Sequence, residues 1–176
     1  MADFNQVLTP GDVADGLIHT VVEIPEGSSH KIEWDRERAC FMLDRVEPAI
    51  FAKPCNYGFI PQTLDEDGDE LDTLIVTKDP LTTGVWLEAK VVGVLKFEDD
   101  GEMDHKVVCV PADDRTSGDS IATLDDLGDQ WKKQLEHHFT HYKDLKRPGS
   151  TKVLGWGDAT EAMAIIEECI GNYSAS

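Results

Sequence analysis

The alternation of hydrophobic and polar positions divides the chain into a β-rich first part and a helical last third. Short runs rich in β-branched residues, or alternating between apolar and polar residues, predict strands. In chain order the predicted strands cover residues 17–24, 31–35, 39–46, 71–77, 85–97 and 105–110. The run 39–46 is expected to be mostly buried, and Gly93 is expected to bend the longest strand. Residues 51–63 contain two prolines and no clear period, and are expected to form a loop.

Two helices are predicted near the end of the chain. Between residues 129 and 142, apolar side chains recur at helical spacing, at Trp131, Leu135, Phe139 and Tyr142. Asp158 and Glu161 are spaced as a capping box for a final helix. Closely spaced strands separated by turn residues predict a small antiparallel sheet or barrel. We find no repeat or linker, so residues 1–176 are expected to form one domain.

Composition and charge exclude several classes of function. The formal net charge of −19 argues against binding a nucleic-acid backbone, which rewards Lys and Arg. No apolar run approaches the length of a membrane span, and the N-terminus lacks the pattern of a signal peptide. The cysteines are widely spaced, with no C-x-x-C pair, as in proteins of reducing compartments: Cys40, Cys55, Cys109 and Cys169. We therefore expect a soluble cytoplasmic protein.

Residues 65–72 hold six acids within eight positions. Carboxylates this dense repel one another unless an opposing charge is present. Gly68 lets the backbone turn, so that Asp67 and Asp69 can face one site, and Asp72 stands at the start of a strand. Mg²⁺ prefers such oxygen ligands. A solvated acidic turn is the simpler interpretation, and a calcium loop fails because glycine is missing from its sixth position and glutamate from its twelfth.

Other acids recur beside the few cations of the chain. Glu33 follows Lys31 by two residues, and Lys106 follows Asp104 by two residues. Each such pair alone is usually a surface ion pair of small energy. Together they suit a site in which carboxylates hold metal ions, while Lys, Arg and Tyr bind phosphoryl oxygens. Metal ions would also reconcile an acidic pocket with an anionic substrate.

The sequence resembles the family I soluble inorganic pyrophosphatases of the short prokaryotic type, from about residue 21 to the final helix. The most specific match is Asp67-Gly68-Asp69-Glu70-Leu71-Asp72, which fits the family signature D-x-D-[PE]-apolar-D. Further segments match in order and approximate spacing: VEIP at 22–25, KIE at 31–33, LDR at 43–45, PCNYG at 54–58, VGVLK at 92–96, 99–106, and HYKDL at 141–145.

The resemblance implies an α+β, mainly β fold: an OB-like five-stranded β-barrel flanked by two main α-helices. It implies an enzyme that hydrolyses pyrophosphate to two phosphates with several Mg²⁺ ions per active site, with Mn²⁺ or Zn²⁺ as substitutes. It also implies self-association, most commonly as a homohexamer. Two alternatives stay open, namely a related phosphohydrolase acting on nucleotides or other diphosphates, and an inactive acidic protein that binds divalent cations.

The resemblance also implies a role for each site residue. The metal ligands would be Asp67, Asp72, Asp104, Asp99 and Glu33. Asp69 would accept the proton of the attacking water, with Tyr57, Arg45 and Lys31 counted among the catalytic residues. Phosphate oxygens would be bound by Lys31, Arg45, Tyr57, Lys106, Tyr142 and Lys143. Glu23 would be a supporting acid near the site.

One position departs from the family pattern. Lys53 stands where the family commonly has tyrosine, just before the Pro-x-Asn-Tyr segment. This puts one hydrogen bond near the catalytic acids in doubt, and Lys53 could form an ionic interaction there instead. Three histidines, His137, His138 and His141, lie in the first predicted helix. Because their spacing matches no ligand motif, we interpret them as surface or subunit-contact residues.

Overall fold

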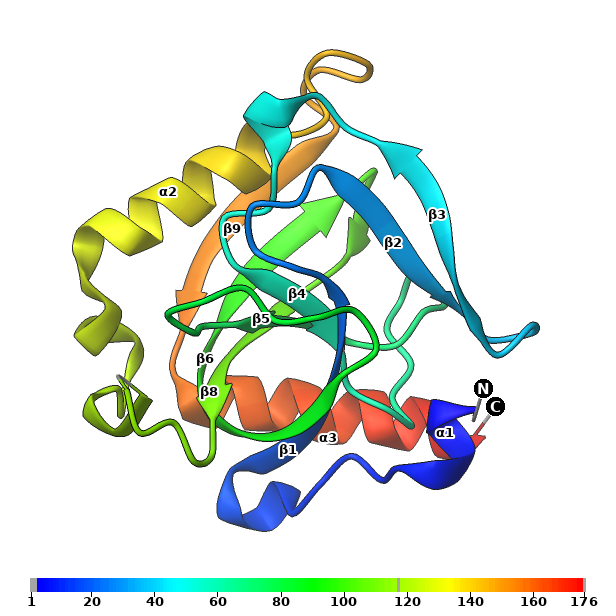
Figure 1. Ribbon diagram of the computed structural model, residues 1–176, viewed down its shortest axis with the longest axis vertical. Coiled ribbons are helices and arrows are strands. Elements are labelled where there is room, and N and C mark those ends of the chain that lie inside the picture. Colours follow the sequence, from blue (N-terminus) through cyan, green and yellow to red (C-terminus); the bar gives the residue numbers. More distant parts are fainter. Residues whose placement is uncertain (1–2, 117, 176) are drawn as a thin grey trace.

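The computed structural model describes residues 3–116 and 118–175 (Figure 1). The helices are α1 (Phe4–Val7), α2 (Gly128–His141) and α3 (Ala159–Ala175), with short 3-10 turns at Val13–Asp15, Ala49–Phe51, Gly118–Ser120 and Leu124–Leu127. The strands are β1 (Leu17–Ile24), β2 (His30–Asp35), β3 (Cys40–Val46), β4 (Asn56–Phe59), β5 (Asp72–Ile75), β6 (Trp86–Asp99), β7 (Glu102–Met103), β8 (Lys106–Pro111) and β9 (Thr151–Gly157).

Five strands form a closed ring. Neighbours pair in the order β1-β4-β5-β8-β6, and β6 pairs with β1 to complete the circuit. The ring confirms the five-stranded architecture that the resemblance implied. All its pairs are antiparallel except β5–β8, so the expected antiparallel sheet or barrel contains one parallel pair. Closing the ring leaves its strands without a free edge.

The long strand β6 bends, and it pairs with ring strands along one part of its length and with β7 and β9 along the other. Its register against β8 shifts between Val91 and Gly93, as expected for a strand that bends at a glycine. A Cβ atom on Gly93 would lie 2.3 Å from Cδ1 of Leu124, so only glycine fits there. Beyond the bend, β6 pairs with β9 and β7 and carries its end, at Asp99, away from the ring.

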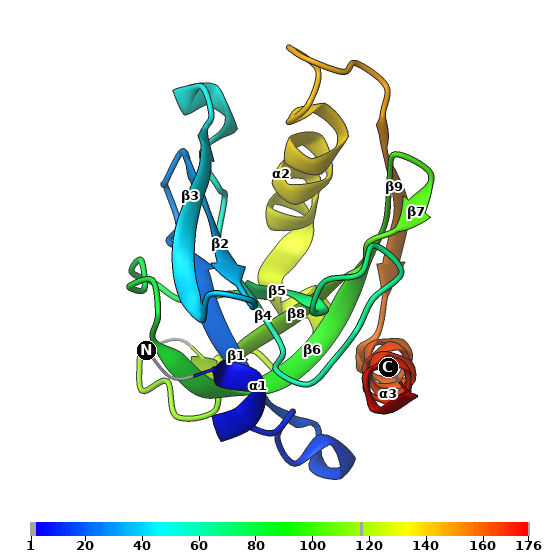
Figure 2. The same ribbon diagram turned by 90° about the vertical axis from the view of Figure 1, so that its right-hand side faces the viewer.

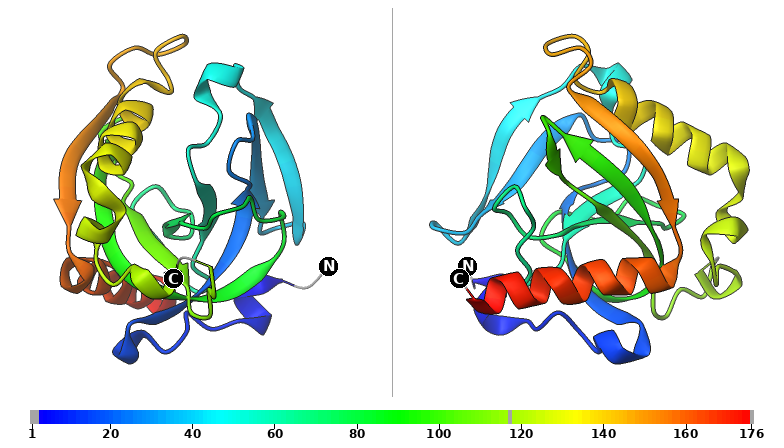
Figure 3. Two further views of the ribbon diagram at one scale, coloured as in Figure 1. Left: turned by 60° about the vertical axis from the view of Figure 1, so that its left-hand side comes forward. Right: turned by 180° about the vertical axis from the view of Figure 1, so that it is seen from behind.

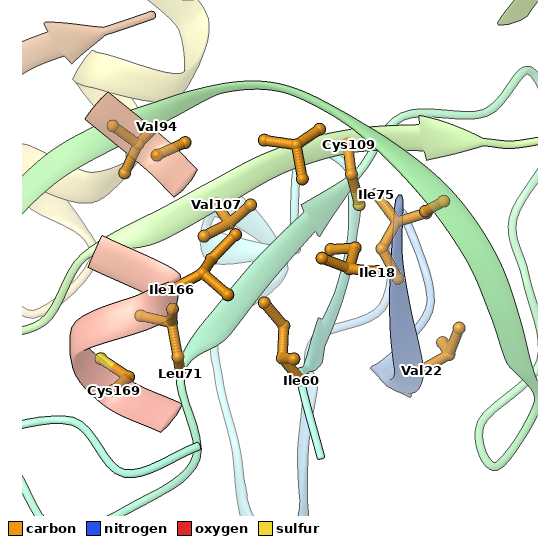
Figure 4. Packing of buried hydrophobic residues seen from close by; sticks show 13 residues of the cluster. Ile18, Val22, Ile60, Leu71, Ile75, Val94, Val107, Cys109, Ile166 and Cys169 are labelled. Atoms are coloured by element: carbon orange, nitrogen blue, oxygen red, sulfur yellow. The ribbon is translucent and has the colours of Figure 1, made fainter. Parts of the chain in front are cut away.

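The interior of the ring is filled with apolar side chains, and α3 closes one end of it (Figure 4). Ile166 and Cys169 of α3 share one buried cluster with ring residues such as Ile18, Ile75 and Val107. The predicted capping box begins this helix, because Glu161 N donates to Asp158 Oδ1 at 2.9 Å and Asp158 N donates to Glu161 Oε2 at 3.3 Å. No described helix is long and apolar enough to cross a membrane.

Helix α2 covers a second part of the sheet. Leu135 and Phe139 are almost fully buried against Leu95 and Phe97 of β6. The helix predicted for 129–142 is therefore confirmed to within one residue at each end. Its C-terminal end points toward the mouth of the ring, opposite the β2–β3 hairpin (Figures 2 and 3).

The β2–β3 hairpin forms a separate two-stranded sheet. It is fixed to the ring through an aromatic cluster in which Trp34 and Phe41 contact Phe4 of α1, and Phe4 contacts Phe59 of β4. The expectation that residues 39–46 are mostly buried was wrong, since Leu43 is 54% exposed. A two-stranded sheet has one face against the protein and one in solvent.

Three strands were not predicted, and one of them is the two-residue strand β7. β4 lies inside the segment 51–63 that was expected to be a loop, and β9 follows α2 with no predicted element at its position. β4 is only four residues long and buried at every position. Asn56 and Gly58 are residues with low strand propensity. Each has a specific contact in β4: the Asn56 side chain donates a hydrogen bond to the Thr77 hydroxyl, and Gly58 lets β4 approach β1 closely.

Gly58 gives a test of this close approach. A Cβ atom at residue 58 would lie 2.0 Å from the carbonyl oxygen of Val21 in β1, so the strands would have to separate. We expect Gly58→Ala to lower the free energy of unfolding by about 1–3 kcal/mol or more, as overpacking does. The measurement is urea denaturation. Gly171→Ala is the matched control, because a Cβ atom there meets nothing within 4 Å; it should stabilise α3 by roughly 0.5–1 kcal/mol. Equal stabilities of the two variants would contradict the packing argument.

Candidate active site

A polar cavity of about 460 Å³ opens at the mouth of the ring. Its walls come from β1 to β6, the segments that precede β5 and β8, and the residues that follow α2. The cavity lies between the β2–β3 hairpin on one side and the end of α2 on the other, which stand apart across the mouth in Figure 2.

Twelve of the thirteen site residues expected from the sequence line this cavity. They are Glu23, Lys31, Glu33, Arg45, Tyr57, Asp67, Asp69, Asp72, Asp99, Asp104, Tyr142 and Lys143. The thirteenth, Lys106, lies behind the wall, with its side chain 2% exposed. Residues that span more than a hundred positions of the chain are thus brought to one place by the ring, the hairpin and α2.

The floor of the cavity is built on strand register. Asp72 begins β5 and Lys106 begins β8, and the two residues are direct partners in the parallel pair β5–β8. Lys106 Nζ donates to Asp72 Oδ2 at 2.5 Å and also to Asp104 Oδ1. Tyr57 of the neighbouring strand β4 donates its hydroxyl to Asp72. Asp72 therefore receives two donors, while Lys106 is shared between two carboxylates.

This arrangement leaves the carboxylates short of positive charge. Burial raises the pKa of Asp72 by more than the neighbouring Lys106 lowers it, and Asp104 raises it further. At Asp104, burial opposes ionisation, but Lys106 outweighs it and lowers the pKa. Burial likewise opposes the charge on Lys106, yet Asp72 and Asp104 together raise its pKa above the ordinary value. One buried ammonium thus compensates two carboxylates.

A second cluster of an acid with its hydrogen-bond donors lies at the end of β6. Asp99 accepts a hydrogen bond from the Tyr142 hydroxyl at 2.9 Å and contacts the Lys143 ammonium. Tyr142 and Lys143 directly follow α2, so the packing of that helix on β6 fixes their positions. Burial raises the pKa of Tyr142, and the negative charge of Asp99 adds to the effect. The phenol therefore stays a hydrogen-bond donor at neutral pH.

The hairpin supplies the third group. Lys31 and Arg45 are cross-strand partners in the β2–β3 pair. Lys31 contacts Glu33, and Arg45 bonds to Asp44 at 2.6 Å and to Glu47. Both cations therefore project from one small sheet toward the cavity, each held by acids.

Glu23 connects the ring to the hairpin. Its carboxylate accepts a hydrogen bond from the backbone N–H of Trp34 at 2.6 Å. Burial raises the pKa of Glu23 well above the ordinary value, and Asp72 raises it further. This contact holds β2 against β1 at the cavity wall, and the supporting role that the resemblance gives to Glu23 stays a prediction.

The acidic segment 65–72 forms a tight turn before β5. Asp65 N donates to Asp69 O at 2.8 Å and Gly68 N donates to Asp65 O at 3.1 Å. Gly68 has a φ of +90°, a conformation that favours glycine. Asp69 N donates to the side chain of Asp67 at 3.0 Å. The prediction that Gly68 turns the chain is confirmed, and both Asp67 and Asp69 line the cavity.

Several supporting residues carry no motif that the sequence could reveal. Glu70 of the signature is buried, and its carboxylate accepts from Arg36 Nε at 2.8 Å and from Asn5 Nδ2 at 2.6 Å. Glu47 holds Arg45 and lines the cavity. Asn5 belongs to α1, which precedes every matched segment. Such long-range contacts leave no spacing signal in the sequence.

The histidines of α2 separate into two groups. His138 is 9% exposed, and its ring stacks on Tyr142 with centroids 5.8 Å apart. His137 and His141 lie on the open side of the helix with ring centroids 4.6 Å apart, and His141 Nδ1 is 2.7 Å from Asp144. The surface interpretation therefore holds for His137 and His141 and was wrong for His138.

The donor set fits hard divalent cations. The carboxylates of Asp67, Asp72, Asp99, Asp104 and Glu33 line one cavity, and they offer only oxygen ligands. Among residues 3–116 and 118–175, no three side chains form a ready-made ligand shell. Lys106 fills the space between Asp72 and Asp104. Coordination would thus involve rearrangement of these contacts.

The sequence matches the model of a known family along most of its length. Residues 20–174 match the family model described as inorganic pyrophosphatase. An inorganic pyrophosphatase from Neisseria meningitidis is 67% identical over 174 residues, which are 99% of this chain and 98% of the relative. One from Haemophilus influenzae is 66% identical over 99% of each chain.

Solved structures give the same result. The crystal structure of an inorganic pyrophosphatase from Neisseria gonorrhoeae superposes with a TM-score of 0.96 at 66% identity, covering 98% of this chain and 99% of that one. The structure of the enzyme from Thermus thermophilus superposes with a TM-score of 0.87 at 40% identity, covering 95% and 97% of the two chains.

Proposed function

The chain belongs to the inorganic pyrophosphatase family and hydrolyses pyrophosphate, and we propose that it does so with Mg²⁺ in the cavity at the mouth of the ring. The observation that supports this site is the convergence of acids and cations from separate elements on one cavity of about 460 Å³. Enzymes of this family depend on metal ions. Mg²⁺ is the metal we propose because every candidate ligand is a carboxylate, with Mn²⁺ or Zn²⁺ as substitutes.

The proposed metal ligands surround the floor of the cavity. Asp67, Asp72 and Asp104 would hold one cation, and Asp72 would also reach a second. Asp99 and Glu33 stand further along the walls and would hold the cations that accompany pyrophosphate. Bound cations supply charge neutralisation at the phosphoryl groups and lower the pKa of the attacking water. The burial and crowding of Asp72 favour this use, because its carboxylate gains an additional opposing charge.

Asp69 is the proposed proton acceptor. It follows Gly68 in the tight turn, and its side chain is 84% exposed to the cavity mouth. Its ion pair with Arg36 is long, at 4.0 Å, so the Asp69 carboxylate is only weakly compensated. A carboxylate with free lone pairs can accept a proton from water that attacks phosphorus. Phosphoryl transfer then depends on positioning and charge stabilisation rather than on further covalent chemistry.

The remaining cations and phenols are the proposed phosphate ligands. Lys31 and Arg45 approach from the hairpin, Tyr142 and Lys143 from the end of α2, and Tyr57 with Lys106 from the floor. Each is held in place by an acid or by a buried contact before the substrate arrives. Prior positioning reduces the entropy lost on binding.

The first test is the reaction itself. We expect the purified protein to release phosphate from pyrophosphate only with a divalent cation, fastest with Mg²⁺, because the acids cannot approach a polyanion uncompensated. ATP is the control substrate and should be hydrolysed far more slowly. Full activity in excess chelator would contradict metal dependence at this site. Equal rates on ATP would favour a nucleotide hydrolase.

The second test separates a proton acceptor from a metal ligand. Asp69→Asn keeps the shape but cannot accept a proton, and should reduce kcat by about 10²–10⁴ at near-normal Mg²⁺ affinity. Asp72→Asn should weaken Mg²⁺ binding, measured by calorimetry, together with activity. Asp113→Asn, an exposed acid outside the cavity, is the matched control. Wild-type kcat in Asp69→Asn would show that the proton goes elsewhere.

We propose that residues 1–176 form one pyrophosphatase domain and that the protein assembles as a homohexamer in the cytoplasm. We propose no nucleic-acid partner and no membrane partner. Support for the domain comes from the match over residues 20–174 and from the packing of α2 and α3 on the same sheet. The open face of α2 is the proposed subunit contact. It presents His137 and His141, and Leu145 beyond its end is 74% exposed.

Light scattering tests the assembly. The wild type should have six times the mass of the 19.5 kDa chain at micromolar concentration. His141→Glu adds a negative charge to the proposed contact beside Asp144, and should produce smaller species. Thr160→Glu, at the exposed start of α3, is the control and should leave the mass unchanged. A monomeric wild type would exclude the hexamer. If Thr160→Glu dissociates the assembly and His141→Glu does not, the subunit contact lies at α3 instead of α2.

A further inference from the structure

Lys53 lies in the cavity at a position where the resemblance leads us to expect tyrosine. It stands three residues before the start of β4 at Asn56, and its side chain contributes to the cavity wall. The same residue also lines a small adjoining recess together with Lys31, Arg45 and Tyr142. Lys53 therefore stands at the side of the cavity where the proposed phosphate ligands gather.

Three aromatic rings surround the Lys53 ammonium. Its Nζ lies 4.2 Å from the ring centroid of Tyr57, 5.5 Å from that of Tyr142 and 5.6 Å from that of Phe139. These rings come from β4, from α2 and from the residue that follows α2. Cation–π attraction favours a cation at these distances but does not use its N–H donors.

The other cations of the site differ from Lys53 in one respect. Lys31, Arg45, Lys106 and Lys143 each form an ion pair with at least one carboxylate. Among the residues that the structure describes, the Lys53 ammonium forms no ion pair and no hydrogen bond, although the charge of Asp72 acts on it from a greater distance. Burial, and the nearby charge of Lys106, lower the pKa of Lys53 to about 8. Its three donors are therefore free for an incoming anion.

We propose that Lys53 binds a phosphate oxygen of pyrophosphate, as a substrate ligand additional to the set that the family resemblance supplies. This inference rests on the proposed location of the active site. A phosphoryl group in the cavity beside Lys53 would also meet Lys31 and Arg45, because all three residues line the cavity wall. Unlike those two, Lys53 loses no carboxylate contact when it binds the anion. A tyrosine, the common residue of the family, would offer one neutral donor in place of an ammonium.

The proposal predicts a loss of affinity when the charge is removed. Lys53→Met keeps the length and the contact with the rings but has no donor. Since a hydrogen bond to a charged group contributes roughly 10- to 100-fold in binding, KM for pyrophosphate should rise by that factor. The dissociation constant of methylenediphosphonate, a diphosphonate with a non-hydrolysable bridge, should rise in parallel in calorimetry. Lys53→Arg keeps the charge and should stay within about threefold of the wild type.

Lys146→Met is the matched control, because Lys146 is an exposed cation at the rim of the cavity with no ion pair among the described residues. It removes the same charge and should change KM by less than about threefold, as screened surface charges do. Circular dichroism checks folding, and Lys53→Gln replaces the methionine variant if that protein does not fold.

The outcomes are distinct. Unchanged KM and unchanged diphosphonate affinity in a folded neutral variant would overturn the proposal, as would a fall in kcat alone. An equal rise of KM in Lys146→Met would also overturn it, because the effect would then be general electrostatics. If Asp69→Asn loses turnover while Lys53→Met binds normally, the site assignment stands and only the role of Lys53 fails. Normal activity in both variants would refute the site assignment itself.

Discussion

The sharing of one buried ammonium between Asp72 and Asp104 is the interaction on which the active-site region depends. Lys106 is 2% exposed, and a buried charge is tolerated only where opposite charge and hydrogen bonds compensate it. The two carboxylates supply that compensation, and Tyr57 adds a donor to Asp72. The charge compensation is incomplete, because one ammonium faces two carboxylates. Burial therefore raises the pKa of Asp72 despite the neighbouring Lys106. A site that must receive further cations requires this deficit.

The ring of strands maintains this arrangement at low flexibility. Asp72 and Lys106 are direct partners across the parallel β5–β8 pair, so their distance is fixed by backbone hydrogen bonds. The acidic turn and the hairpin lie outside the ring, and each is anchored by contacts with another element. Glu70 joins the turn to Arg36 and Asn5, while Glu23 accepts from the backbone of β2. Rigid strands thus hold the floor where we propose that metal ions bind, and anchored loops add the groups proposed to contact substrate.

Much of this organisation was accessible from the sequence, for physical reasons that differ between elements. Runs with a clear period, such as 17–24 and the helix at 129–142, were located to within a residue or two, because burial of one face imposes that period. β4 was missed because two of its four residues have low strand propensity. Asn56 forms a side-chain hydrogen bond to the backbone of Ile75, and Gly58 allows β4 to approach β1 closely. The exposure of β3 could not be foreseen, since it depends on a hairpin that leaves the ring. The carboxylates of the site were predicted from their density and their motif. The contacts of Glu47 and Glu70 have no local signal.

The acidic character of the chain sets a final constraint on how an anion is accommodated. With a formal charge of −19, the protein repels pyrophosphate at long range, and nearly every cation of the cavity is already paired with an acid. A phosphate oxygen must therefore compete with carboxylates for Lys31, Arg45 and Lys143. Divalent cations at those carboxylates would weaken the competition, because each acid would then share its charge with the metal. Cation binding and substrate binding in the proposed site thus favour one another, and by linkage the preference is mutual. Lys53 differs, since its ammonium is enclosed by rings rather than acids and needs no such release.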